Sequence, residues 1–142
     1  MNVFVKDIMK KQIVSIDSSL KAKDAATLMT DSGVSCVVVI EKNVPVGMLT
    51  ERDFVTKISA LGKYSSTSIR EIMSMPLITI SPDATVAKLT ELMSEKKIHK
   101  VPVVEGGKLL GIVTATDLIR KCIMDSNLEM RPICSAFAQM AF

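Results

Sequence analysis

With 142 residues, the chain is long enough for one compact body with a shared core, whereas two independent domains of half that length would each be marginally stable. Eighteen basic and fifteen acidic side chains give a net charge of +3, without the basic excess or the interleaved aromatic residues that indicate nucleic-acid binding. No apolar run has the length of a membrane span or the form of a signal peptide, so we expect a soluble cytoplasmic protein.

An internal repeat appears when the chain is aligned with itself at an offset of 64 residues. Residues 5–54 then pair with residues 69–118 without a gap, and 11 of the 50 pairs are identical. Most other pairs keep their chemical type, as Ser15 and Thr79 do. A register held over this length indicates a duplicated structural unit.

Each repeat is predicted to open with one helical turn, at residues 5–9 and 68–71, followed by a short β-branched strand at 13–16 and 77–80. Polar residues at 17–19 and 81–83 break these strands and supply caps for the next helix. That helix is amphipathic, because apolar side chains recur at helical spacing over 22–29 and 86–93.

Two further strands are predicted in each repeat, at 36–40 and 44–49 and again at 101–104 and 108–113, with tight turns between them. Second helices begin at Thr50 and Thr114. The predicted fold class is therefore mixed α/β with tandem β-α-β-β-α repeats. We divide the chain into repeat 1 (1–64), repeat 2 (65–125) and a tail (126–142).

The tail is predicted to be helical, because Pro132 suits a first helical turn and several apolar side chains share one face of the helix. These side chains are Ile133, Ala136, Phe137, Met140 and Ala141. We expect the stripe to pack on its own domain or on a second copy of the chain.

One pattern, Gly-h-h-Thr-x-x-Asp with h an apolar residue, closes the last strand of each repeat, at residues 47–53 and 111–117. Its threonine and aspartate have the spacing of a helix cap. The same geometry also places amides near a phosphate and a carboxylate near the hydroxyls of a ribose. For one copy capping is the favoured interpretation, and two complete copies add weight to the ligand interpretation.

These features together resemble the cystathionine β-synthase (CBS) domain pair, also called a Bateman module. The resemblance covers about residues 4–124 and includes the segments 5–9, 97–104 and 107–114. It implies two repeats related by a pseudo-twofold, with two clefts between them, often assembled as a homodimer. It also implies regulatory binding of AMP, ADP, ATP or S-adenosylmethionine, with occupancy conveyed to a partner protein.

Carried over position by position, the resemblance implies that Asp53 and Asp117 hold the ribose hydroxyls. The phosphate would meet Thr50, Thr114, Arg52, His99 and Lys100. The base and the cleft walls would involve Val14, Ser15, Ile78, Thr79, Val37 and Val101.

The two repeats differ beside these positions. Repeat 1 has Ser35-Cys36 where repeat 2 has His99-Lys100, so repeat 2 is predicted to be the better polyphosphate site. An exposed position at a strand start is the simpler role for the single histidine.

No catalytic group can be assembled from one histidine, so we expect no enzyme activity and no obligatory cofactor. The three cysteines lack metal-ligand spacing and are odd in number, which predicts neither a disulfide framework nor a metal site and favours a reducing compartment. The function predicted is a regulatory ligand sensor acting on another protein. The alternative is a ligand-free module for dimerisation or protein interaction.

Overall fold

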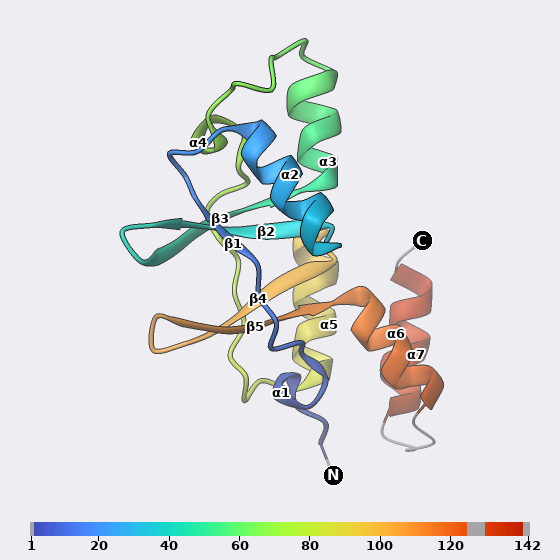
Figure 1. Ribbon diagram of the computed structural model, residues 1–142. Coiled ribbons are helices and arrows are strands. Elements are labelled where there is room, and N and C mark those ends of the chain that lie inside the picture. The colour runs from blue at the N-terminus through green and yellow to red at the C-terminus, as the bar shows by residue number, and fades with distance from the viewer. Residues whose placement is uncertain (1, 125–129, 141–142) are drawn as a thin grey trace. The chain divides into compact units, whose positions relative to one another are not determined.

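The computed structural model describes residues 2–124 and 130–140, without the side chains of residues 136–138 and 140 (Figure 1). The chain forms two compact units, which are described separately below. Unit 1 contains residues 1–12 and 79–142, and unit 2 contains residues 13–78.

Unit 2 is built around a three-stranded sheet with the order β1-β2-β3, in which β1 is parallel to β2 and β2 is antiparallel to β3. A single bridge between Met48 and Ser74 adds one residue beside β3. The elements are β1 (Ser15–Asp17), α2 (Ala22–Ser32), β2 (Cys36–Glu41), β3 (Val44–Thr50), α3 (Glu51–Asp53), the π-helical turn η1 (Phe54–Ser59) and α4 (Ile69–Ile72).

Unit 1 has the same plan with a shorter ladder. The hairpin of β4 and β5 is flanked by single bridges, from Ile80 to Val103 on one side and from Lys10 to Ile112 on the other. The elements are α1 (Val5–Ile8), α5 (Val86–Lys96), β4 (Lys100–Glu105), β5 (Lys108–Thr114), α6 (Ala115–Met124) and α7 (Arg131–Met140).

The opening turns are exchanged between the repeats. Helix α1 begins the first sequence repeat, yet Val5 is fully buried in the core of unit 1 with α5, β4 and β5. Helix α4 begins the second sequence repeat, yet Ile69 and Ile72 are fully buried in the core of unit 2. The compact units therefore do not begin and end where the sequence repeats do, and each contains segments from both.

The strand expected at residues 77–80 is reduced to the single bridge of Ile80. In unit 2 the amide of Val38 donates to the carbonyl of Val14, at 3.0 Å, and extends the ladder. The residue in register with Val38 is Pro102, which has no N–H to donate. The ladder in unit 1 is correspondingly shorter.

Both predicted hairpins are present. The two-residue turns place Lys42 and Asn43, and likewise Gly106 and Gly107, at positive φ, as a type I′ turn requires. The helix caps differ from the prediction, because α2 begins after Lys21 and α5 after Thr85. Asp17 instead accepts hydrogen bonds from the amide and hydroxyl of Ser19.

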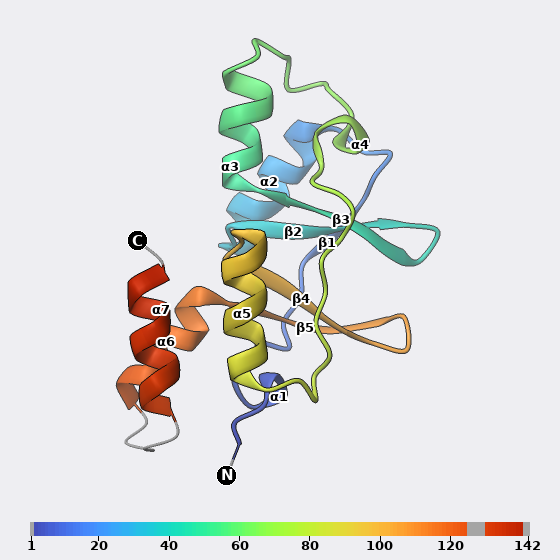
Figure 2. The same cartoon turned by 180° about the vertical axis from the view of Figure 1, so that it is seen from behind.

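The tail is helical over α7, which lies beside α6 in both views (Figures 1 and 2). Ile133 and Cys134 pack against the core of unit 1. The rest of the predicted apolar stripe lies outside the described side chains.

The expectation of no disulfide is wrong, because Cys122 of α6 is bonded to Cys134 of α7. The spacing of 12 residues carries no sequence signal. The packing of α6 against α7 brings the two Cα atoms to 5.9 Å, within the range for a disulfide. The argument for a reducing compartment therefore loses its basis.

Candidate functional site

The repeated threonine and aspartate form a capping box in both units. In unit 2 the amide of Thr50 donates to Oδ2 of Asp53 at 2.9 Å, and the amide of Asp53 donates to the hydroxyl of Thr50 at 3.4 Å. In unit 1 the equivalent distances between Thr114 and Asp117 are 2.9 and 3.2 Å. The capping role considered for this pattern is therefore present twice, and it uses one oxygen of each carboxylate.

The glycine of the pattern is explained by a close backbone approach. A Cβ at Gly47 would lie 2.9 Å from the carbonyl oxygen of Ser74, and one at Gly111 would lie 2.5 Å from that of Lys10. Only glycine leaves room for these segments, which bridge to Met48 and Ile112. The pattern thus holds a short segment against the last strand, directly beside the capped carboxylate.

The second oxygen of Asp53 is also fully engaged. Its Oδ1 accepts from the hydroxyl of Ser74 at 3.0 Å and lies 3.0 Å from Nζ of Lys57. Lys57 donates further to the carbonyl of Ile72 at 3.0 Å and to the hydroxyl of Ser74 at 3.2 Å. An ammonium has three donors, so the whole cluster is internally satisfied.

The second oxygen of Asp117 has two other cations nearby. Its Oδ1 accepts a hydrogen bond from Nη1 of Arg120 at 3.5 Å and lies 3.9 Å from Nζ of Lys10, and the Asp117 side chain is only 2% exposed. The Lys10 and Arg120 side chains are 56% and 54% exposed. The buried Asp117 carboxylate therefore lies close to Lys10 and Arg120, and both of these side chains are more than half exposed to solvent.

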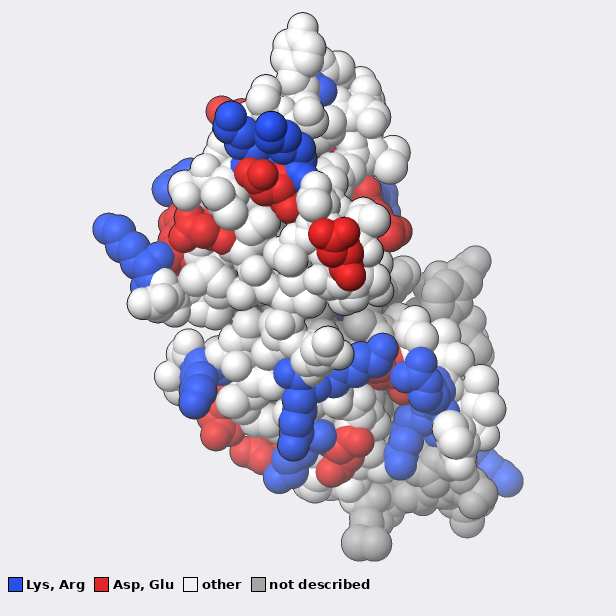
Figure 3. Space-filling view, viewed as in Figure 1, with Lys and Arg blue, Asp and Glu red and all other residues white. Residues whose placement is uncertain are grey.

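Charge is distributed unequally between the units. Residues 13–78 contain seven basic and seven acidic side chains, whereas residues 1–12 and 79–142 contain eleven basic and eight acidic ones. The net charge of +3 therefore belongs to unit 1. Figure 3 shows basic side chains gathered on unit 1 over α1, the segment that follows it and α6.

The remaining predicted site residues have varied exposure. Val37 and Val101 are buried in the cores of units 2 and 1. Half-buried positions are Val14, Ile78, Lys100, Thr50 and Thr114, and exposed positions are Ser15, Thr79, Arg52 and His99. The ligand roles assigned to these residues stay predictions.

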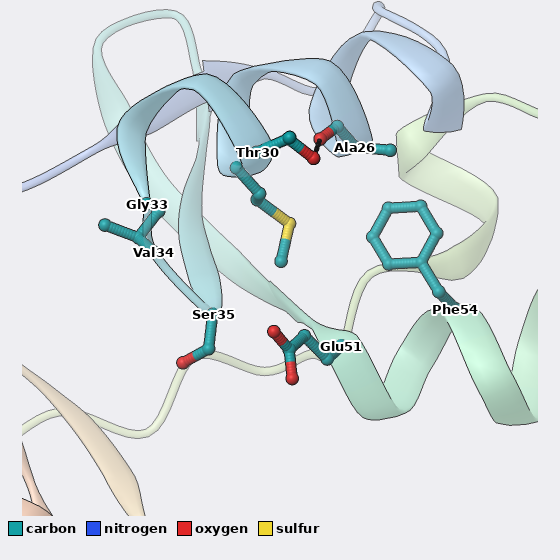
Figure 4. Close-up of a pocket in the computed structure, with 8 residues that line it drawn as sticks. Ala26, Thr30, Gly33, Val34, Ser35, Glu51 and Phe54 are labelled. Carbon is teal, nitrogen blue, oxygen red and sulfur yellow. Dashed lines mark hydrogen bonds between the residues drawn. The ribbon is translucent and has the colours of Figure 1, made fainter.

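One pocket lies beside helices in each unit. A pocket of about 540 Å³ in unit 2 lies between the end of α2 and the start of α3, where Ser35 and Glu51 face the same opening (Figure 4). A pocket of about 690 Å³ in unit 1 lies between α5 and α7. None of the predicted ligand residues lines either of them. The unit 2 pocket does adjoin the capping box through Glu51, which lies between Thr50 and Asp53.

The residues that sequence analysis missed are Lys57 and Ser74 in unit 2 and Lys10 and Arg120 in unit 1. Ser74 and Lys10 stand in the same register of the repeat, 64 residues apart, so the alignment contained part of the signal. Over the described residues, no group of histidine, cysteine and acidic side chains is arranged to hold a metal ion. In the same residues, no helix is both long enough and apolar enough to span a membrane.

Two α/β units of one plan, each with a capped carboxylate at the start of its last repeat helix, define a tandem-repeat protein. Comparison with known proteins names the family. The chain belongs to the CBS domain family, whose domain matches residues 5–60 and 69–123.

Relatives share the same region. CBS domain-containing protein YhcV of Bacillus subtilis is 33% identical over 114 residues, which cover 80% of this chain and 81% of YhcV. Uncharacterized protein MK0525 of Methanopyrus kandleri is 36% identical over 122 residues, covering 84% of this chain and 62% of MK0525. The chain thus spans less than two thirds of the length of MK0525.

Solved structures share the fold. The CBS domain pair of protein MJ0100, in complex with 5′-methylthioadenosine and S-adenosylmethionine, has a TM-score of 0.76 and 27% identity, covering 84% of this chain and 95% of that chain. The hexameric CBS-CP12 protein from bloom-forming cyanobacteria has a TM-score of 0.79 and 26% identity, covering 99% of this chain and 92% of that chain. The mixed α/β fold with tandem CBS repeats is confirmed.

Proposed function

We propose that this chain is a regulatory module that binds an adenosine-containing ligand and signals its occupancy to a partner protein. The observation that carries the proposal is the pair of capped, buried carboxylates, Asp53 and Asp117, each at the end of a CBS repeat. A carboxylate held rigidly by its own helix is suited to accept hydrogen bonds from both hydroxyls of a ribose.

The ligand class is supported by the family and by one relative. The CBS domain pair of MJ0100 binds 5′-methylthioadenosine and S-adenosylmethionine, which share an adenosine group. AMP, ADP, ATP and S-adenosylmethionine are therefore the compounds to test. Regulation requires that the ligand favour one arrangement of the protein over another, because equal affinity for both would shift nothing.

Calorimetric titration of the full chain with these four compounds tests the proposal. We expect binding by at least one of them, and mass spectrometry of the denatured protein should identify any ligand that is purified with it. Asp117→Asn and Asp53→Asn are the variants of choice, because asparagine keeps an acceptor oxygen for the capping amide. If none of the four compounds binds, and the variant that carries both substitutions keeps the stability and assembly of the unaltered chain, the ligand role is wrong.

A second candidate is a ligand-free interaction module that forms a homodimer or docks a partner. It is favoured by the capping boxes, which already explain both aspartates, and by the exposure of Val55, Leu61 and Tyr64 on and after η1. Sedimentation analysis with and without the nucleotides distinguishes the two candidates, since only a sensor changes its assembly or shape when a ligand is added. No enzyme activity and no obligatory cofactor is part of either proposal.

A further inference from the structure

We propose that the disulfide between Cys122 and Cys134 is a redox switch, which holds α7 against α5 when it is oxidised and releases α7 when a dithiol reduces it. The inference goes beyond the proposed function, because the switch needs no ligand. It assigns a site of thiol–disulfide exchange to unit 1 and identifies α7 as the segment that moves.

The disulfide joins the tail helix α7 to the last repeat helix, α6. Its two cysteines are 12 residues apart in the sequence, and α5, β4 and β5 all precede them. The buried core of unit 1 comes mainly from these earlier elements and from α1. The crosslink therefore constrains the end of the chain and does not connect the core strands to one another.

Unit 2 shows that a repeat of this plan folds without a tail helix. Its buried core is drawn entirely from residues 13–78. In α2, Ala26 and Thr30 line the open pocket of unit 2 (Figure 4). Their register partners in α5, Thr90 and Ser94, line the pocket that α7 borders. We therefore expect unit 1 to keep its fold when α7 leaves, with the outer face of α5 as open as that of α2.

Among the described side chains, the packing that holds α7 is a small apolar patch. Met130, directly before the helix, is 1% exposed, and Ile133 and Cys134 pack half-buried against the core of unit 1. Beside this patch, a pocket of about 690 Å³ separates α5 from α7. A helix of 10 residues is also marginally stable in water without tertiary support. We therefore expect the crosslink to decide whether α7 stays on α5.

Exchange at the disulfide requires that a thiolate reach one of its sulfur atoms. Cys122 and Cys134 are half-buried, so neither side chain is enclosed in the core. A thiolate of the dithiol attacks one sulfur and breaks the S–S bond, and the second thiol of the dithiol then resolves the mixed disulfide. Two electrons and two protons pass from the dithiol to the protein. The products are two cysteine thiols and a cyclic disulfide, and the reverse reaction reoxidises the protein.

Hydrogen exchange of the full chain, with and without dithiothreitol, tests this inference. Alkylation without denaturant, followed by mass spectrometry, first shows whether both thiols have formed in the native protein. We expect the amides of α7 to exchange roughly a hundredfold faster in the reduced chain, which is the loop-closure contribution of a short loop. The amide NMR shifts of β4 and β5 should stay those of the folded unit.

Cysteine variants separate the switch from other effects of the reductant. Cys134→Ser should show fast exchange of α7 both with and without dithiothreitol, because it cannot form the crosslink. Cys36→Ser is the matched control, since this cysteine lies in β2 of unit 2 and outside the disulfide. It should respond to dithiothreitol as the unaltered chain does. Oxidised dithiothreitol, added after the reductant is removed, should restore slow exchange in the unaltered chain and not in Cys134→Ser.

Three results would overturn the inference. Unchanged exchange of α7 in the reduced chain would show that packing alone holds the helix. Loss of the folded β4 and β5 shifts on reduction would show that unit 1 needs the disulfide to fold. A disulfide that dithiothreitol reduces only in denaturant would be closed to exchange in the native protein. Each of these results leaves the proposed ligand function untouched, because none of the measurements contains a nucleotide.

Discussion

Asp53 and Asp117 occupy the same place in the two repeats and make the same bonds to their own helices, yet their outward oxygens have different neighbours. Oδ1 of Asp53 lies 3.0 Å from both Lys57 and Ser74, whereas Oδ1 of Asp117 lies 3.5 Å from Arg120 and 3.9 Å from Lys10. In both units Oδ2 accepts the hydrogen bond from the threonine amide and caps the helix. The two units differ in the neighbours of Oδ1.

The first prediction compares the stability of the two units when unit 1 alone loses a covalent crosslink. The disulfide between Cys122 and Cys134 closes a short loop in unit 1, and unit 2 has no disulfide among its described residues. Breaking it with dithiothreitol, or with Cys122→Ser, should reduce stability by about 3 kcal/mol from lost loop closure. Hydrogen exchange should show the loss in α6 and α7 and leave the amides of α2 unchanged. Equal loss in α2 would contradict independent behaviour of the units.

A second prediction concerns the glycines that admit the neighbouring segments. Gly111→Ala should cost about 1 to 3 kcal/mol, because the new Cβ would meet the carbonyl of Lys10 at 2.5 Å. Gly47→Ala should cost less, since its approach to Ser74 is 2.9 Å and its other close neighbour is a flexible methionine side chain.

Urea unfolding measures both changes in the free energy of unfolding. Gly33→Ala is the matched control, because φ is +65° there and no atom lies within 4 Å of the added Cβ. It should cost only the backbone strain of a left-handed residue, about 1 to 2 kcal/mol. A smaller loss for Gly111→Ala than for Gly47→Ala would show that the segments yield and that the approach distances do not limit the fold.

These glycines illustrate how far the sequence alone leads. The register of 64 residues predicts the hairpins, the amphipathic helices and the two capped aspartates, because all of them depend on residues close together in the chain. It does not predict that α1 packs in unit 1 and α4 in unit 2, since that exchange depends on tertiary packing. Lys10, Ser74 and the disulfide were missed for the same reason: each meets its partner only after distant segments have packed.

Lys57 was missed for a local reason. It lies four residues after Asp53 in η1, which is π-helical, whereas α6 contains no such turn over its described length. Periodicity does not distinguish the two helices. The register partner of Lys57 is also a lysine, Lys121.

A third prediction compares the ion pairs directly. Lys57→Met should destabilise the protein by about 1 to 2 kcal/mol, because it leaves the buried Asp53 with fewer partners. The loss is below that of a fully buried pair because the Lys57 side chain is 35% exposed. Arg120→Met should cost less than about 0.5 kcal/mol. Thermal unfolding measures both, and equal losses would remove the distinction between the two carboxylates.

The smallest expected effect is on the pKa of Asp17. In the second repeat the order is reversed, because Ser81 stands in register with Asp17 and Asp83 with Ser19. The hydroxyl of Ser19 lowers the pKa of Asp17, followed by its backbone amide. A lowered pKa stabilises the fold above the ordinary aspartate value, and this stabilisation is lost as the pH falls through the lowered value. Ser19→Ala should raise the pKa of Asp17 toward its usual value, as measured by a carboxyl NMR titration. An unchanged pKa would contradict the assigned cause.

The most direct test of the account is the NMR spectrum of the full chain during titration with AMP, because the backbone amides report each unit separately. We predict that the amides of at least one capping pair, Thr50 with Asp53 or Thr114 with Asp117, shift as AMP is added. Shifts elsewhere in the chain with none at either pair would contradict the claim that a capped aspartate holds the ligand.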